Sequence, residues 1–124
     1  MSDARSDTFA NEVRSGAQRI ADERARQVVV EGWSLRHDQE HDGGELIDAA
    51  RCYITSAEAT YYDPRNVTFD GFRPGEGPPR SWPVGWETTS WKPTGDPLRD
   101  LTKAGALIAA EIDRLLYREM PDDG

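Results

Sequence analysis

Three stretches of the 124-residue chain place apolar residues every three or four positions between charged ones, which is the period of an amphipathic α-helix. The first covers about residues 7–31, with Ser6 or Asp7 able to cap its start. Valines at positions 28–30 are β-branched, but Glu31 and Gly32 follow at once and favour the end of a helix. We therefore expect one long helix that ends at about Glu31.

The second helix is expected over about residues 43–60. Asp42 precedes it and Glu45 follows three positions later, which is the arrangement of a capping box. The apolar stripe of this helix consists of Leu46, Ala49, Ala50, Tyr53 and Ile54. Because Pro64 disfavours helical conformation in the residue before it, the helix is expected to end by Thr60.

The third helix, over about residues 97–118, has the strongest pattern. Asp96 is placed to cap it, and Pro97 suits its first position. Its apolar face is expected to consist of Leu98, Leu101, Ala104, Gly105, Ile108, Ile112 and Leu115. Glycine and alanines make the helix narrow, which favours close approach of another helix and predicts a homo-oligomer.

Residues 61–97 hold seven of the eight prolines and three of the four tryptophans, which excludes regular helix. Trp82, Trp86 and Trp91 are unfavourable in water, so this insert, about residues 61–96, is expected to pack on the helices. The predicted fold class is all-α: a single domain over 1–124, a compact bundle of three main helices with an irregular Trp/Pro-rich insert, and frayed termini.

Composition narrows the function classes. The formal net charge of −8 disfavours direct binding of nucleic acid or an anionic membrane. A lone cysteine, Cys52, excludes an internal disulfide and is expected to be a small buried apolar side chain. No apolar run is long enough for a signal peptide or a membrane span, so we expect a cytoplasmic protein.

Both histidines lie among carboxylates between Arg36 and Asp48, and three uses of this segment stay open. His37-Asp38-Gln39-Glu40-His41 matches an inverted zinc-protease pattern, but Gly43-Gly44 interrupts any long helix there. Structural use would assign Asp42 and Glu45 to capping. Alternatively, inward-facing carboxylates would hold Mg²⁺ or Mn²⁺, for which the candidates are Glu23, Glu45, Asp48 and Glu111.

A binding site without turnover is the remaining hypothesis. Arginine, tryptophan and histidine are common anchors for small ligands and partner proteins. The candidate ligand-binding residues are Arg26, Trp33, His37, Asp38, His41, Trp91 and Lys92. The partner would be a small molecule such as a nucleotide, or a host protein.

The order of several segments resembles a group of small phage and prophage proteins of unknown function, also found as a module in early-region proteins of lambdoid phages. The segments include Glu31-Gly32-Trp33, His37-Asp38, Gly44-Glu45-Leu46, Trp91-Lys92-Pro93 and the run from Leu101 to Leu115. The resemblance covers about residues 19–116, with an insertion at about 63–80. It implies a viral accessory protein that modulates host processes or defence.

A looser resemblance is to MazG-like nucleotide pyrophosphohydrolases, whose E-x-x-D motif Glu45-Leu46-Ile47-Asp48 matches in spacing. Their E-E-x-x-E motif is matched poorly, because Arg26 stands where its third carboxylate belongs. The sequence thus predicts a phage accessory protein that binds a ligand or partner, with a Mg²⁺- or Mn²⁺-dependent pyrophosphohydrolase as the alternative.

Overall fold

The computed structural model describes residues 14–31, 44–62 and 72–119. Within these ranges the chain forms three α-helices and no strand: α2 (Gly16–Glu31), α4 (Glu45–Ala57) and α5 (Pro97–Glu119). A π-helical turn, η1 (Glu58–Tyr62), continues α4, and a 3-10 turn, η2 (Thr88–Ser90), lies in the insert. The predicted all-α fold with three packed helices is confirmed.

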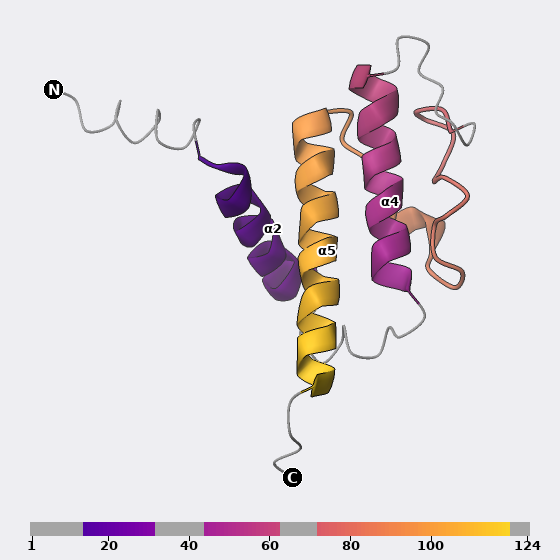
Figure 1. Cartoon of the computed structure of the whole chain (residues 1–124). Helices are drawn as coiled ribbons and strands as arrows, with labels where there is room; N and C mark the ends of the chain where they lie inside the picture. Colours follow the sequence, from indigo (N-terminus) through magenta and orange to yellow (C-terminus); the bar gives the residue numbers. More distant parts are fainter. Residues whose placement is uncertain (1–13, 32–43, 63–71, 120–124) are drawn as a thin grey trace, which may run out of the picture.

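Helix α5 lies between the other two helices (Figure 1). It runs antiparallel to α4 and in roughly the same direction as α2 (Figure 1). The described part of the insert, residues 72–96, lies beside α4 and leads to the start of α5 (Figure 1). Helix α5 therefore packs against both α2 and α4, and its residues also reach the insert.

The predicted start of the first helix, at Ser6 or Asp7, is wrong for a continuous helix, because residues 14 and 15 are not helical. Helix α2 begins at Gly16 with a capping box that the sequence analysis missed. The backbone N–H of Gln18 donates to Ser15 Oγ at 3.1 Å, and the N–H of Ser15 donates to Gln18 Oε1 at 3.2 Å. These reciprocal bonds satisfy the first N–H groups of α2 locally.

The predicted capping box at the second helix is also wrong. Helix α4 starts at Glu45, and its N-cap is Gly44, whose φ of 91° is in the left-handed region that favours glycine. Gly44 has no side chain with which to cap this end, and Glu45 is the first helical residue rather than the third. Instead, the negative charges of Glu45 and Asp48 in the first turn interact favourably with the positive end of the helix dipole.

The start of α5 follows the prediction. The backbone N–H of Leu98 donates to Asp96 Oδ1 at 3.0 Å, and Pro97 is the first helical residue. A second carboxylate, that of the fully buried Asp100, accepts hydrogen bonds from Ser56 Oγ at 3.1 Å and from the N–H and hydroxyl of Thr94, both at 2.9 Å. Asp100 thus joins α4, the end of the insert and α5.

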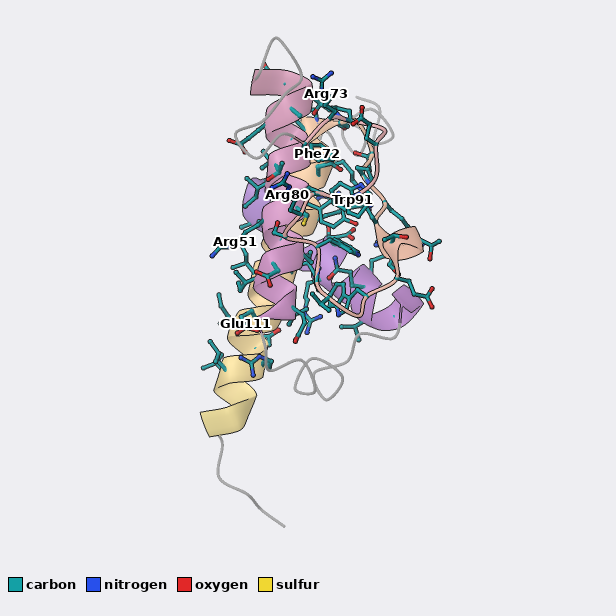
Figure 2. All side chains as sticks on the ribbon, turned by 90° about the vertical axis from the view of Figure 1, so that its right-hand side faces the viewer. Arg51, Phe72, Arg73, Arg80, Trp91 and Glu111 are labelled. Carbon is teal, nitrogen blue, oxygen red and sulfur yellow. The ribbon has the colours of Figure 1, made fainter. Side chains whose placement is uncertain are left out.

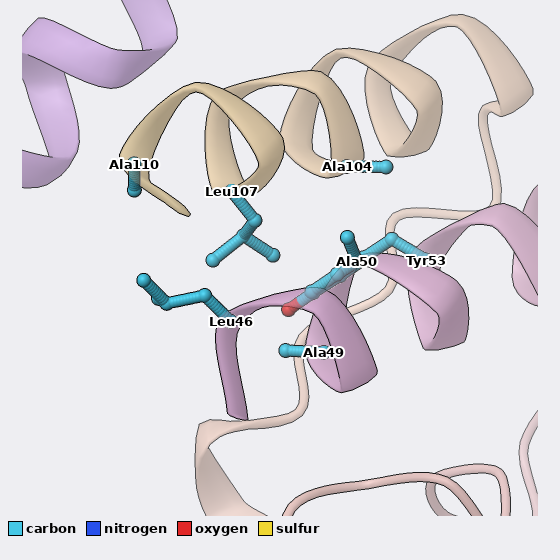
Figure 3. Packing of buried hydrophobic residues seen from close by; sticks show 7 residues of the cluster. All are labelled: Leu46, Ala49, Ala50, Tyr53, Ala104, Leu107 and Ala110. Atoms are coloured by element: carbon cyan, nitrogen blue, oxygen red, sulfur yellow. The ribbon is translucent and has the colours of Figure 1, made fainter. Parts of the chain in front are cut away.

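The core between α4 and α5 is made mainly of small side chains. Leu46, Ala49, Ala50 and Tyr53 of α4 face Ala104, Leu107 and Ala110 of α5 (Figure 3). The buried alanines bring the two helices close together, as the narrow third helix predicted. Cys52 is fully buried, which confirms that prediction.

The predicted core face of α5 is wrong for its large aliphatic residues. Leu98, Leu101, Ile108, Ile112 and Leu115 are 38–52% exposed, whereas Asp100 and Arg114 are buried. Burial of these two polar residues is tolerated because each finds partners, Asp100 as described above and Arg114 in a two-bond pair with Glu111 at 2.8 Å. A hydrophobic pattern takes no account of such partners.

The tryptophans of the insert pack against the helices, as predicted. The Trp91 ring lies 4.7 Å from Tyr53, 5.4 Å from Trp82 and 6.1 Å from Phe72 between ring centroids. The Phe72 and Trp91 side chains lie between the insert and α4 (Figure 2). Trp86 extends the aromatic cluster with an edge-on contact to Trp82 at 5.6 Å.

Candidate binding pocket

A cavity of about 230 Å³ lies where α2, α4, α5 and the insert meet. Its charged lining residues are cationic: Arg26 from α2, Lys92 from the insert and Lys103 from α5. The remaining lining residues are Ala49, Tyr53, Trp82, Trp86, Ser90 and Leu107. No carboxylate is among the lining residues that belong to the described part of the chain, although the chain carries a net charge of −8.

The two lysines of this cavity are the only lysines in the sequence, which has thirteen arginines. An ammonium group is a compact, mobile charge with three donors and no acceptor. Lys103 donates one hydrogen bond, at 2.8 Å, to the backbone carbonyl of Lys92. Its Nζ lies 5.5 Å from the centre of the Tyr53 ring, on whose face a cation is stabilised.

The backbone of Lys92 is held from two helices. Its N–H donates to the hydroxyl of Tyr53 in α4 at 3.2 Å, while its carbonyl accepts from Lys103 in α5. The neighbouring Trp82 donates its indole N–H to the carbonyl of Glu87 at 3.3 Å. These bonds fix the insert as a wall of the cavity instead of a loose loop.

Lys103 is electrostatically unusual. Burial disfavours its charged form and, with the nearby charge of Arg99, lowers the pKa of Lys103 below its ordinary value. Glu23 and Asp100 oppose this shift through their negative charges. A negative charge close to Lys103 would stabilise its protonated amine.

Arg26 is positioned by Glu23, one turn earlier on α2. Its Nε and one terminal nitrogen donate to the two oxygens of Glu23 at 2.9 and 2.7 Å, and Arg99 binds the same carboxylate at 2.7 Å. Burial alone would raise the pKa of Glu23, but the bonds and charges of Arg26 and Arg99 outweigh it and lower the pKa. Glu23 therefore stays ionised and fixes the Arg26 guanidinium at the cavity.

The ligand-binding candidates predicted from sequence are only partly brought together. Arg26 and Lys92 line the cavity. Trp91 is not among its lining residues but supports it through a tilted ring contact with Tyr53 and an edge-on contact with Trp82. Trp33, His37, Asp38 and His41 lie outside the described residues.

The four metal candidates do not converge. Glu23 is bound by two arginines, Glu111 by Arg114, and Glu45 and Asp48 lie in the first turn of α4. Among the residues that the structure describes, no group of three histidine, cysteine or acidic side chains is close enough to hold a metal ion. The geometry of these four residues therefore lends no support to the pyrophosphohydrolase alternative.

Sequence reasoning did not select Tyr53, Ser90 or Lys103 as site residues, although the structure places them in the cavity wall. Tyr53 lies on the apolar stripe of its helix, which points to a core role, whereas Lys103 resembles a surface lysine of an amphipathic helix. The count of lysines was an available indication, since both lysines flank the predicted start of the third helix. Their convergence still depends on how the insert folds back.

Comparisons with family models, with curated proteins and with solved structures find no match to this chain. In the described part of the chain, no helix combines the length and apolar character needed to cross a membrane.

Proposed function

We propose that this chain is a small accessory protein that binds an aromatic anion in the cavity between α2, α4, α5 and the insert. One observation carries the proposal: three cations and three aromatic side chains line one cavity, and none of its lining residues within the described ranges is a carboxylate. Charged hydrogen bonds from Arg26, Lys92 and Lys103 would hold the anionic group. Tyr53, Trp82 and Trp86 would contact the ring.

The size of the cavity limits the ligand. Pockets for drug-sized molecules are typically about 300–1,000 Å³, so a cavity of about 230 Å³ suits something smaller. A single aromatic ring that carries a carboxylate or phosphate has the matching size and charge. The ligand class is thus a small aromatic carboxylate or phosphate.

The sequence resemblance to small phage and prophage proteins supports a role in an infected or lysogenic host. Binding of a small molecule without chemistry would act by sequestering or sensing it in the host cytoplasm. The acidic surface supports the same assignment, because it disfavours nucleic acid as the main partner. A sequestering or sensing role needs no metal or other cofactor.

Tryptophan fluorescence tests the proposal directly, because Trp82 and Trp86 line the cavity. Benzoate and phenyl phosphate are titrated against a neutral ring, benzamide, and against non-aromatic anions, acetate and inorganic phosphate. The aromatic anions are expected to change the emission and to raise the melting temperature. Benzamide, acetate and inorganic phosphate are expected to bind at least about tenfold more weakly. Benzamide lacks the charged contacts, and the two non-aromatic anions lack the contacts with the ring.

Lys103→Met is expected to weaken binding of the aromatic anions by about tenfold or more, the usual effect of losing a charged hydrogen bond. Arg51→Met is the matched control, since Arg51 is an exposed cation of α4 outside the cavity wall. Circular dichroism checks that both variants fold. The proposal fails if no aromatic anion binds, or if the two variants weaken binding equally.

A further inference from the structure

Helix α5 carries an exposed apolar stripe made of Leu98, Leu101, Ile108, Ile112 and Leu115. Their exposed fractions are 51%, 40%, 38%, 52% and 44%. With Gly105, these positions alternate in steps of three and four residues, which is the heptad spacing of one helix packed along another. If these apolar positions of α5 served only the core of one chain, their side chains would be buried.

The middle of the stripe is completed by helix α2. Ile20 lies over Gly105 so closely that a Cβ at position 105 would stand 2.5 Å from Ile20 Cδ1. The stripe is therefore continuous and apolar from Leu98 to Leu115. Beyond Glu111, the last turns of α5 extend past the start of α4, which leaves this part of the helix projecting from the bundle (Figures 1 and 2).

We propose that a second copy of this chain packs on the α5 stripe, with the two α5 helices antiparallel. Reversal of the helix direction sets Leu98 against Leu115 and Leu101 against Ile112 of the other copy, so that each layer is apolar. Ile20 and Ile108 would fill the centre from both copies. The stripe is thus complementary to itself about a two-fold axis.

Charge favours contact through this face. Two chains of net charge −8 repel each other, so a stable contact requires a surface without carboxylates. The stripe contains no charged residue, and Thr102, Ala109 and Leu116 along one side of it are uncharged as well. On its other side, the negative charge of Glu111 is paired with Arg114. Added salt would screen the remaining repulsion and strengthen the dimer.

The area sets the expected strength. Five or six half-exposed aliphatic side chains form a patch on the order of 500 Å², close to the upper end for monomers. Two such patches bury about 1,000 Å² in total, which is the lower limit for a specific interface. We therefore expect a dissociation constant in the micromolar range instead of a permanent dimer.

Sedimentation equilibrium of the full chain over about 1–500 µM tests the proposal. The mass is expected to rise with concentration from 13.9 kDa toward twice that value, and to rise at lower concentration in high salt. A mass that stays at 13.9 kDa throughout, at low and high salt, overturns the proposal.

Ile112→Glu and Leu115→Glu are expected to weaken dimerisation by about tenfold or more, because each places a carboxylate in the stripe. Val29→Glu is the matched control, since Val29 is an aliphatic residue of α2 that is 81% exposed and lies off the stripe. Circular dichroism confirms that each variant folds. Equal weakening by all three variants would place the contact elsewhere and refute the stripe.

Cross-linking tests the antiparallel arrangement in otherwise unaltered chains. Chains with Leu98→Cys and chains with Leu115→Cys, when mixed, are expected to form a disulfide-linked pair, while each alone is not. Disulfides within each separate preparation, and none between them, would mean parallel helices and overturn the proposed geometry.

Discussion

The contact between Gly105 and Ile20 determines how α2 packs on α5, and a double-mutant cycle tests it. Alanine in place of a mid-helix glycine normally stabilises by about 1 kcal/mol. Here the new Cβ would stand 2.5 and 2.7 Å from Ile20 Cδ1 and Cγ1, and overpacking of this kind costs about 1–3 kcal/mol. Gly105→Ala alone is therefore expected to destabilise the fold by about 1 kcal/mol.

The sign of this effect should reverse once Ile20 is shortened. In an Ile20→Ala background the space above Gly105 is free, so Gly105→Ala should stabilise by about 1 kcal/mol, a coupling of about 2 kcal/mol between the two sites. Urea denaturation of the four proteins at 25 °C measures both values. If Gly105→Ala has the same effect in both backgrounds, Ile20 does not restrict the space over Gly105 and the reasoning is wrong.

Four further changes test other parts of the structure. Asp100→Ala is expected to lower the unfolding free energy by about 2–4 kcal/mol in urea denaturation, because Ser56 and Thr94 lose a charged acceptor; a loss below about 0.5 would contradict the buried network. Ser15→Ala should cost about 1 kcal/mol in the same assay through its cap, and no change would place the helix start elsewhere. Since the pKa of Glu23 is lowered, its stabilising effect is present above the unfolded pKa and is lost as pH falls through the folded pKa. Glu23→Gln should therefore reduce the loss of unfolding free energy at acid pH. An unaltered acid loss would show that Glu23 is not the group responsible. Since the pKa of Lys103 is also lowered, the affinity for phenyl phosphate should fall as pH rises, at a lower pH than that at which an ordinary lysine loses its proton. Lys103→Arg should remove this fall. A pH profile of affinity that this variant leaves unchanged would exclude Lys103 as the titrating group.

Local patterns predicted the helices but misplaced two of their starts. Asp96 caps α5 and Pro97 is its first residue, so the signals for this helix start are local and the start could be predicted from sequence. At α4, Asp42 and Glu45 fitted a capping box equally well, but the left-handed Gly44 lets the chain enter the helix later. A cap motif predicts a helix end only when no neighbouring glycine offers another entry.

The pocket was only half predictable. Arg26 and Lys92 were candidates on residue type, whereas Lys103 resembled an ordinary surface lysine of an amphipathic helix. Of the candidate metal ligands, Glu45 and Asp48 fitted a motif in spacing. Glu23, a further candidate, is held by arginines from α2 and α5 in the folded chain. Spacing along one helix says nothing about which charges another helix brings to it.

What the sequence by itself determined is local: the periods that make α2, α4 and α5 helices, and the prolines that keep the insert irregular. The tertiary structure alone decided which face of α5 is buried, since Asp100 and Arg114 find partners there while Ile112 and Leu115 remain exposed. It also decided that both lysines and Arg26 meet beside Tyr53. These outcomes depend on contacts between segments far apart in the chain, because the net free energy of burying a polar or apolar side chain is set by its neighbours in space.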